Sequence, residues 1–396
     1  MLLTLRGWCC LLGGIAWTLA ALYSDQRDTI WPGVFLAVLP LISLVLMLPC
    51  FRRVRFARET PGAPISVGQR TRYHLRVRIP WLLPGGLAAV TENMDSGLGQ
   101  AWQFQFPVGF TGAAGRFEIP LMPHWRGKHE PGPGVLIVKD PLRMARAKRQ
   151  LPKTGDSIVV VPKIFALESH QSFSPGDQLR TLSPSGRQDI DDVLLREYRP
   201  GDDTRRIHWR ASAKLGELLI RQEEQGHNPK ARILLDNRAA AYGSETVDLR
   251  FELAISWAGS ICAQLLTEGF EVELLTADGP LGCWTAGMGH AREAMLLQLA
   301  FLHRSQRLHL PLGALAGQEE FVAVVLGRVI PDDLHTLAPG QSSGARKAVL
   351  IQPDADSEPL VADPADALRA LSWSTASAAL DVPPARTWAE LLGGRR

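Results

Sequence analysis

Two long apolar segments, separated by a short polar run, open the chain. Residues 7–23 and residues 30–51 contain no charged side chain, whereas residues 24–29 are mostly polar. Each apolar segment is about long enough to cross the hydrocarbon core of a bilayer as a helix, the first only marginally. If the first segment were a cleaved signal peptide, the second would still hold the protein in the membrane. We therefore predict a transmembrane helical hairpin over residues 1–52.

Basic residues beside these segments predict their orientation. Arg6 precedes the first segment, and Arg52, Arg53, Arg55 and Arg58 follow the second. Basic residues concentrate on the cytoplasmic side of membrane helices. We therefore expect both termini to lie in the cytoplasm, with a very short loop on the other side.

From about residue 61 the period of hydrophobicity changes to two. Apolar and polar side chains alternate over residues 72–79, 102–108 and 116–121, and glycine and proline clusters separate these segments. Half-buried antiparallel strands with turns at short intervals are typical of a β-sandwich. We predict a small β-sandwich over residues 61–171, followed by a linker and a polar segment over residues 172–230.

The last part of the chain, residues 231–396, alternates apolar strand-like runs with amphipathic helices. We expect strands at residues 232–236, 270–276, 321–327 and 347–351, and helices at residues 248–268 and 292–303. Strands that alternate with helices predict a doubly wound sheet. The predicted fold class is therefore α/β plus all-β, behind a two-helix transmembrane hairpin.

Composition excludes several functions. The formal net charge of the 396 residues is only +3, which gives no global argument for binding nucleic acid. The five cysteines show no CxxC or Cys/His ligand spacing, so neither a zinc site nor a disulfide framework is indicated.

The polar segment before the α/β region holds the main candidate residues. These are Arg196, Glu197, Tyr198, Pro200, Gly201, Asp202, Asp203, Arg206, Trp209 and Ser212. We expect a strand over residues 194–198, a turn, a helix from Thr204 that ends at Gly216, and a returning strand over residues 218–220. Residues 196–224 contain seven basic and six acidic residues. This near-balance does not indicate a one-sidedly basic surface for binding nucleic acid.

The expected helix would carry a stripe of like charge, formed by Arg206, Arg210 and Lys214 at a spacing of four. Acidic groups should therefore face it. The favoured interpretation is a structural ion-pair network with the flanking acids, and an acidic partner surface is the alternative. The Trp209 side chain is interpreted as core.

No enzyme signature stands out. P-loop, HExxH and GxSxG motifs do not occur, and residues 287–292 lack the third glycine of a dinucleotide loop. Asp202, His208 and Ser212 could be arranged as a triad, but neighbours on one short helix rarely give that geometry. We expect no catalytic residue, no cofactor and no enzymatic activity. The alternative is an uncharacterised hydrolase that uses Asp202, Asp203 or His208.

The polar segment resembles a known family. From Arg196 to Ala213 it follows the pattern Arg-Glu-Tyr-x-Pro-Gly-Asp-Asp-x-Arg-x-Ile-x-Trp-x-Ala-Ser-Ala, the signature of the domain-of-unknown-function family 58. The earlier run Asp140-Pro141 is also similar to the family, although Leu142-Arg143 replaces the usual Phe-Gly pair. The resemblance implies a multi-pass protein of the bacterial inner (cytoplasmic) membrane, whose C-terminal domain looks like a von Willebrand factor A domain.

Such A domains often bind Mg²⁺ through Asp-x-Ser-x-Ser at the end of the first strand. Here that position reads Asp236, Arg238 and Ala240, so both hydroxyl ligands are lost and a cation is added. Mg²⁺ requires oxygen ligands in near-octahedral geometry. We predict no metal at this degenerate site, and we infer that Arg238 pairs with Asp236 in its place.

The resemblance also implies partners. Proteins of this family are commonly encoded beside MoxR-type AAA+ ATPases and transglutaminase-like membrane proteins. We therefore expect a membrane-anchored, cytoplasm-facing adaptor or scaffold in a chaperone-like or envelope-linked system. It would bind a AAA+ ATPase through the α/β domain, with Arg238 expected as a charge at the rim of the contact.

Overall fold

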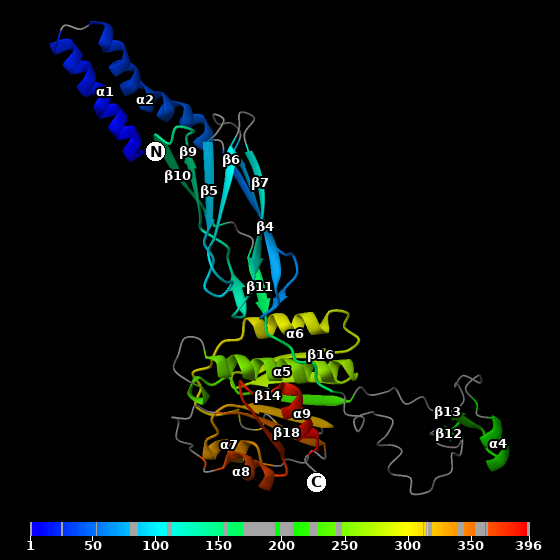
Figure 1. Ribbon diagram of the computed structural model, residues 1–396. Coiled ribbons are helices and arrows are strands. Elements are labelled where there is room, and N and C mark those ends of the chain that lie inside the picture. Colours follow the sequence, from blue (N-terminus) through cyan, green and yellow to red (C-terminus); the bar gives the residue numbers. More distant parts are fainter. Residues whose placement is uncertain are drawn as a thin grey trace. The chain divides into compact units, whose positions relative to one another are not determined.

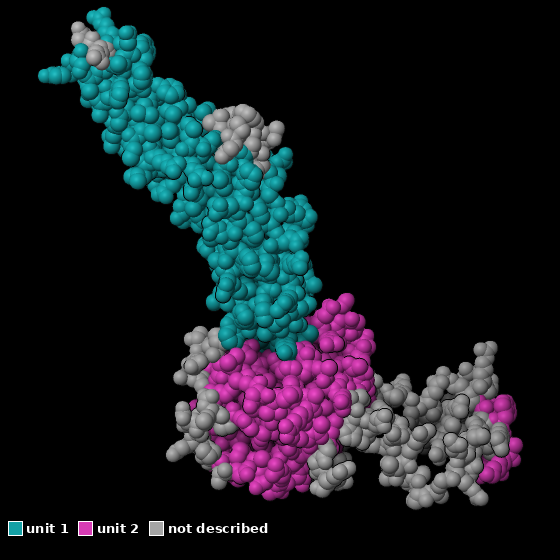
Figure 2. Space-filling model, viewed as in Figure 1, with its two compact units in different colours: residues 1–163, 296–302 teal, residues 164–295, 303–396 magenta. Residues whose placement is uncertain are grey.

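The computed structural model places most of the chain (Figure 1). The described residues are 2–24, 27–52, 54–79, 86–108, 113–153, 157–168, 195–198, 207, 209–221, 229–242, 248–311, 313, 315, 319–338, 344–352, 361 and 363–393. The chain forms two compact units, residues 1–163 with 296–302 and residues 164–295 with 303–396 (Figure 2). Each unit is described by itself below.

The first unit begins with two apolar helices, α1 (Leu5–Tyr23) and α2 (Ile30–Arg52), joined through the short turn η1 (Arg27–Thr29). Small residues let the helices approach closely, because a Cβ added at Gly14 would lie 2.5 Å from the backbone nitrogen of Ala37. Both helices are long and apolar enough to cross a membrane. The prediction of two N-terminal apolar helices is confirmed.

The helix pair is joined to the β region of the same unit. The two-residue strand β1 (Leu2–Leu3) pairs with β10 (Ala145–Leu151). The Ser43 hydroxyl of α2 donates to Asp140 Oδ2 at 2.8 Å, and the Met47 side chain is buried in the β core. One face of the last turns of α2 therefore packs against protein, although the sequence predicted a span that continues to residue 51.

The turn at Asp140 explains a departure from the family pattern. The Asp140 carboxylate, 2% exposed, also accepts a hydrogen bond from the Ala145 amide at 2.7 Å. Arg143 has φ 57°, a left-handed conformation that favours glycine. The usual family glycine at this position therefore matches the backbone of the turn, and Arg143 adopts it at some conformational cost.

Three small sheets make up the β region. Their orders are β1-β10-β9-β5-β6, β2-β4-β7 and β3-β11-β8. The further bounds are β2 (Arg55–Glu59), β3 (Ile65–Ser66), β4 (Thr71–Ile79), β5 (Gly86–Glu92), β6 (Trp102–Val108), β7 (Ala113–Leu121), β8 (Gly127–His129), β9 (Gly134–Lys139) and β11 (Ile158–Val161). All pairings are antiparallel except that of β11 with β3. The antiparallel β region read from the period of two is confirmed.

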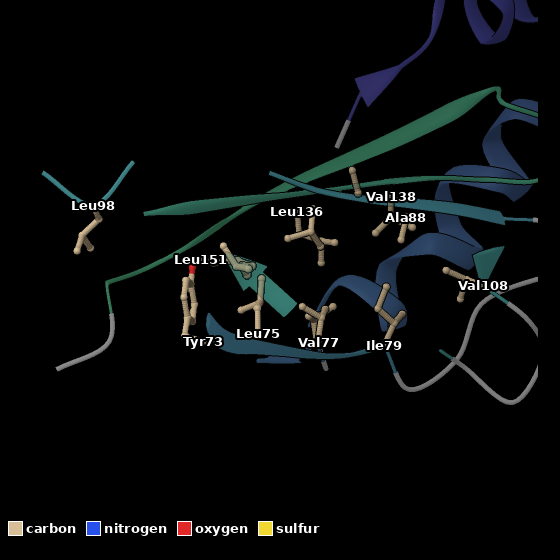
Figure 3. Packing of buried hydrophobic residues seen from close by; sticks show 14 of the residues in the cluster. Tyr73, Leu75, Val77, Ile79, Ala88, Leu98, Val108, Leu136, Val138 and Leu151 are labelled. Atoms are coloured by element: carbon tan, nitrogen blue, oxygen red, sulfur yellow. The ribbon is translucent and has the colours of Figure 1, made fainter. Parts of the chain in front are cut away.

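All three sheets contribute to one hydrophobic core. Alternate residues of β4, from Tyr73 to Ile79, are at most 1% exposed. They point toward Leu136 and Val138 of β9 and Ala88 of β5 (Figure 3). Because successive side chains of a strand point to opposite faces, the intervening residues of β4 lie on the outer face of the sheet.

Arg58 is a correction to the sequence analysis, which placed it in a cluster of basic residues beside the membrane. It lies in β2, a strand that was not predicted, and its side chain is fully buried. Its Nε donates to Glu92 Oε1 at 2.7 Å, and its Nη1 donates to the Pro152 carbonyl at 2.6 Å. Arg58 points inward because it shares a strand face with Phe56, which packs against the core.

The second unit contains a six-stranded sheet in the order β16-β15-β14-β17-β18-β19. Its strands are β14 (Lys230–Leu235), β15 (Glu271–Thr276), β16 (Gly279–Thr285), β17 (Phe321–Leu326), β18 (Ala345–Ile351) and β19 (Ser374–Ala378). They are parallel except β16, which runs antiparallel to β15. This confirms a mixed α/β sheet and the four predicted strands, whereas β16 and β19 were not predicted.

Helices lie on both sides of this sheet (Figure 1). The helices of this unit are α5 (Leu249–Thr267), α7 (Pro331–Thr336), α8 (Pro364–Ala370) and α9 (Pro384–Gly393). Helix α6 (Ala291–Ala300) begins in this unit, and its residues from 296 on belong to the first unit. Asp248 caps α5 by accepting a hydrogen bond from the Arg250 amide at 2.9 Å. The predicted helices correspond to α5 and α6, whereas α7, α8 and α9 were not predicted.

Candidate functional site

The signature segment forms a small strand–helix–strand unit where it is described. Strand β12 (Leu195–Glu197) pairs antiparallel with β13 (Leu219–Arg221), and α4 (Trp209–Leu215) lies between them in sequence. Gly216 follows α4 with φ 77°, as expected for the residue that ends the helix. The two predicted strands and the helix stop are therefore present.

Two predictions for this segment are wrong. The helix does not begin at Thr204, because Ile207 lies in a β-bridge and α4 starts at Trp209. Trp209 is not core, since 66% of its surface is exposed. Trp209 is the first residue of the seven-residue helix α4, whereas Ser212, one turn later, is buried.

Ser212 has a structural position. It is 7% exposed, and its Oγ accepts a hydrogen bond from the Leu219 amide at 2.9 Å, which ties α4 to β13. Pro200, Gly201, Asp202, Asp203, Arg206 and His208 lie outside the described residues, as do the side chains of Arg196 and Glu197. Tyr198 continues the hairpin, and its amide donates to the Leu218 carbonyl at 2.8 Å. The proposed ion-pair network of this segment therefore stays a prediction.

The best-defined polar centre lies at the carboxyl edge of the α/β sheet. Asp236 directly follows β14 and is fully buried, and Arg238, two residues later, is only 1% exposed. Asp333 sits in the first turn of α7 and is also 1% exposed. We call Asp236, Arg238 and Asp333 the buried triad.

All three guanidinium nitrogens of Arg238 donate hydrogen bonds. Its Nε and Nη2 donate to the two oxygens of Asp236, each at 2.9 Å. Its Nη1 and Nη2 donate to the two oxygens of Asp333, at 2.8 and 2.7 Å. Nη1 also donates to the Leu308 carbonyl at 3.1 Å. The pairing of Arg238 with Asp236 inferred from the sequence is therefore present, and Asp333 adds a second carboxylate that the sequence analysis missed.

The position predicted for Arg238 at the rim of a contact surface is wrong. Its side chain is buried, and two buried carboxylates bind it. Each carboxylate makes a bidentate pair with the planar guanidinium, which is among the strongest geometries for such a contact. Ala240, the third residue of the degenerate metal position, is exposed and belongs to the short turn η4 (Ala239–Ala241).

Burial and the neighbouring charges shift the pKa values of the triad in opposite directions. Desolvation raises the pKa of Asp236, and hydrogen bonds from Arg238 offset only part of that rise. Desolvation lowers the pKa of Arg238, but the hydrogen bonds that Arg238 donates to Asp236 and Asp333 and the charges of these two acids more than offset this, so its pKa is raised and the guanidinium stays charged. The Tyr242 hydroxyl, which is also buried, donates to the Asp236 carbonyl at 2.8 Å.

A second polar group lies beside the triad and was also missed. Asn237 is fully buried, and its Nδ2 donates to Asp278 Oδ2 at 3.0 Å and to the His303 carbonyl at 3.1 Å. Ser305 Oγ donates to the other oxygen of Asp278 at 2.6 Å. These hydrogen bonds, that of Ser305 first, lower the pKa of Asp278. Together they fix the loop that follows α6 against the end of β14.

This loop presents side chains to solvent above the triad. Leu308 exposes 67% of its surface, and the side chains of Arg307 and His309 on either side are each 62% exposed. Arg307 Nε lies 3.6 Å from Asp278, and His309 Nδ1 lies 3.5 Å from Asp332. We call residues 307–309 the edge loop.

The triad does not fit a divalent metal. Asp236 Oδ1 and Oδ2 are both engaged by Arg238, whose charge would repel a cation at the same place. Within the part of the chain that the structure describes, no group of three or more His, Cys, Asp or Glu residues could hold a metal ion.

We expect titration of the detergent-solubilised chain with Mg²⁺ or Mn²⁺ to give no saturable heat by calorimetry. The reason is that Arg238 supplies the positive charge between the two carboxylates, where Mg²⁺ would need free oxygen ligands. The Asp236→Asn variant is the matched control and should give the same trace. A saturable heat in the wild type that the variant lacks would contradict the assignment.

Comparisons with known proteins support the family resemblance. Residues 194–309 match the family described as "Protein of unknown function DUF58", which confirms the resemblance read from the signature. This range includes both the signature segment and the end of β14 with Arg238. No curated protein matches the chain.

Similarities to solved structures are weak. The alkylpurine DNA glycosylase AlkC of Pseudomonas fluorescens is 17% identical, over 34% of this chain and 38% of that chain, with a TM-score of 0.18. A CARDB domain from Pyrococcus furiosus is 13% identical, over 27% and 93% of the two chains, with a TM-score of 0.18. The C-terminal domain of wzt is 10% identical, over 28% and 75%, with a TM-score of 0.19. TM-scores this low carry no conclusion about function.

Proposed function

We propose that this chain, which carries the DUF58 segment over residues 194–309, is a membrane-anchored adaptor that holds a cytoplasmic AAA+ ATPase through its α/β domain. The edge loop carries the proposal. Leu308 exposes an apolar side chain to solvent, while its carbonyl is held by the buried Arg238. An apolar side chain on a fixed backbone is suited to protein binding, because little conformational freedom is lost on association.

The position of the edge loop in the sheet agrees with this role. Open α/β sheets bind their ligands at the carboxyl ends of the strands, where the strand order reverses. In this sheet the order reverses beside β14, since β15 lies on one side of it and β17 on the other. If the domain is a von Willebrand factor A-like fold, the loop lies where such domains hold a metal. Contact here would rest on side-chain complementarity, because Arg238 occupies that position.

The adaptor would act at the inner membrane of a bacterium. Its two apolar helices supply the anchor, and a transglutaminase-like membrane protein is the second partner that the family resemblance suggests. In this arrangement both termini and both soluble regions face the cytoplasm, where the ATPase and its ATP are found. The adaptor would serve a chaperone-like or envelope-linked system.

The Leu308→Asp variant should recover about tenfold less ATPase than the wild type when the full chain is purified from membranes. A charge in the centre of an apolar contact costs at least the 1.4 kcal/mol that corresponds to tenfold in affinity. The matched control is Met288→Asp, because Met288 is 56% exposed and follows β16 at the opposite, amino edge of the sheet.

Three results would overturn the adaptor proposal. The first is that no ATPase is enriched with the wild type, and the second is that the Leu308→Asp and Met288→Asp variants recover it equally. The third is that the purified chain alone turns over a substrate, which would favour the hydrolase alternative.

Orientation can be tested with single cysteines in a background that lacks the five native ones. Asp28→Cys, in the exposed turn between α1 and α2, should react with a membrane-impermeant maleimide in intact cells. Arg72→Cys, on the exposed face of β4, should react only after permeabilisation, because the basic flank keeps that side in the cytoplasm. Labelling of Arg72→Cys in intact cells would contradict the proposed topology.

A further inference from the structure

Four arginines surround a shallow hollow on the outer face of the sheet β2-β4-β7. The hollow measures about 440 Å³, and its lining includes Arg55, Arg76, Arg78 and Arg116. Small residues, among them Ala57 and Ala114, also line the hollow. We call this feature the arginine hollow.

Strand register brings these arginines together. Arg55 of β2 lies directly opposite Arg78 of β4, and Arg76 of β4 lies directly opposite Arg116 of β7. Like charges directly opposite each other on neighbouring strands destabilise a sheet. The arrangement therefore favours a bound anion that would separate the positive charges.

The protein itself supplies little negative charge there. Glu59 lies 2.8 Å from Arg76 and 3.5 Å from Arg116, so one carboxylate serves both of them. Arg55 and Arg78 are exposed and have no acidic partner among the residues that the structure describes. The positive charges of Arg55 and Arg78 are therefore not neutralised by any acid that the structure describes.

The hollow lies next to the end of the second apolar helix. Within the hairpin Gly14 packs against Ala37, and Gly33 packs against Thr18, so the start of α1 at Leu5 lies opposite residue 46 of α2. The six remaining residues of α2 extend about 9 Å farther, at 1.5 Å per residue. Arg55 follows the end of α2 after only two residues, so its backbone lies just beyond the headgroup layer, which is about 5–8 Å thick on each side of the bilayer.

We propose that the arginine hollow binds the phosphate group of an anionic phospholipid in the leaflet that faces the β region. A guanidinium matches phosphate geometry with two parallel hydrogen bonds, and Arg55 and Arg78 can both offer this fork. Anionic lipids also attract basic residues that lie within about 8 Å of the surface at physiological ionic strength. The site belongs to the first unit and is separate from the edge loop.

The test uses the full chain in detergent, with bound lipid counted by native mass spectrometry. The wild type should retain phosphatidylglycerol about tenfold more than phosphatidylcholine, and the Arg55→Gln/Arg78→Gln double variant should lose this preference. The matched control is Arg72→Gln, because Arg72 lies on the same face of β4 at its far end and is 71% exposed. It should behave like the wild type.

The double variant should fold normally, since neither arginine leaves an acid unpaired, and its melting temperature checks this. Should it melt lower, the single variant Arg78→Gln replaces it. The proposal fails if the glutamine variants retain as much phosphatidylglycerol as the wild type, or if phosphatidylcholine binds equally well. It also fails if glycerol 1-phosphate or inorganic phosphate displaces the lipid completely, because the hollow would then be a site for a soluble phosphate.

Discussion

The Arg238→Met variant should lower the free energy of unfolding of the α/β domain by about 5 kcal/mol, at the upper end of the range for breaking a buried ion pair. Asp236 and Asp333 would both lose the guanidinium that neutralises them, and both are at most 1% exposed. Water cannot replace the lost partner without opening the edge of the sheet. Such a loss corresponds to a fall in melting temperature of about 10 °C or more in a domain of this size.

Thermal unfolding of the full chain in detergent measures this effect. Arg369→Met is the matched control, because Arg369 pairs with Asp366, both side chains are exposed, and such surface pairs contribute little. Adding Asp333→Asn to Arg238→Met should recover part of the loss, since one of the two unpaired charges is then removed. An unchanged melting temperature for Arg238→Met would show that the triad does not stabilise the domain.

The loss in Arg238→Met should also depend on pH. Burial already raises the pKa of Asp236, and removing Arg238 raises it further. A carboxyl group whose folded pKa exceeds its unfolded value of about 3.9 binds protons more tightly in the folded state. The stability of the variant should therefore increase as the pH falls from about 8 to about 5, and the difference from the wild type should narrow.

The second large effect is expected in the β region. Arg58→Met should cost about 3–5 kcal/mol, because Glu92 would remain fully buried without its partner. The double variant Arg58→Met/Glu92→Leu should be close to the wild type in stability, since apolar residues of similar size often replace a buried pair without loss. Arg72→Met, which removes an exposed arginine paired with Glu118, is the control for loss of charge alone.

Chemical denaturation of the full chain, followed by tryptophan fluorescence, measures this comparison. If Arg58→Met and the double variant are equally destabilised, the cost comes from packing around Arg58 and not from the unpaired carboxylate. If Arg58→Met is as stable as Arg72→Met, the buried pair does not hold the two sheets together.

Elements with a strong period could be predicted from the sequence. The alternation in β4 and β6, the apolar run of β14 and the long amphipathic helix α5 all appear at the expected residues. The short elements α7, α8, β16 and β19 could not be predicted, because their five to seven residues carry too little periodicity. Strand β2 was not predicted because its arginines were interpreted as the basic flank of a membrane helix.

Only part of the candidate site could be predicted from the sequence, because its residues come from distant parts of the chain. Arg238 and Asp236 lie two residues apart, so their pairing could be inferred from the local sequence. Asp333 is 95 residues from Arg238, and nothing in the local sequence predicts contact over that distance. The only signal was the run Pro331-Asp332-Asp333, which marks the start of a helix and so places a carboxylate at the carboxyl edge of the sheet.

The wrong prediction for Trp209 also has a structural reason. A tryptophan in a family signature was interpreted as core because its large apolar surface favours burial. Helix α4 is only seven residues long and is held through Ser212 to β13, so Trp209 at its start remains exposed.

Photo-crosslinking from position 308 in native membranes tests the central claim most directly. A photoreactive residue in place of Leu308 should form a crosslink to an ATP-hydrolysing protein, because this side chain is proposed to lie at the centre of the contact. The same residue in place of Met288, at the opposite edge of the sheet, should not. Absence of an ATPase crosslink at position 308, or crosslinks of equal yield at both positions, would contradict the adaptor account.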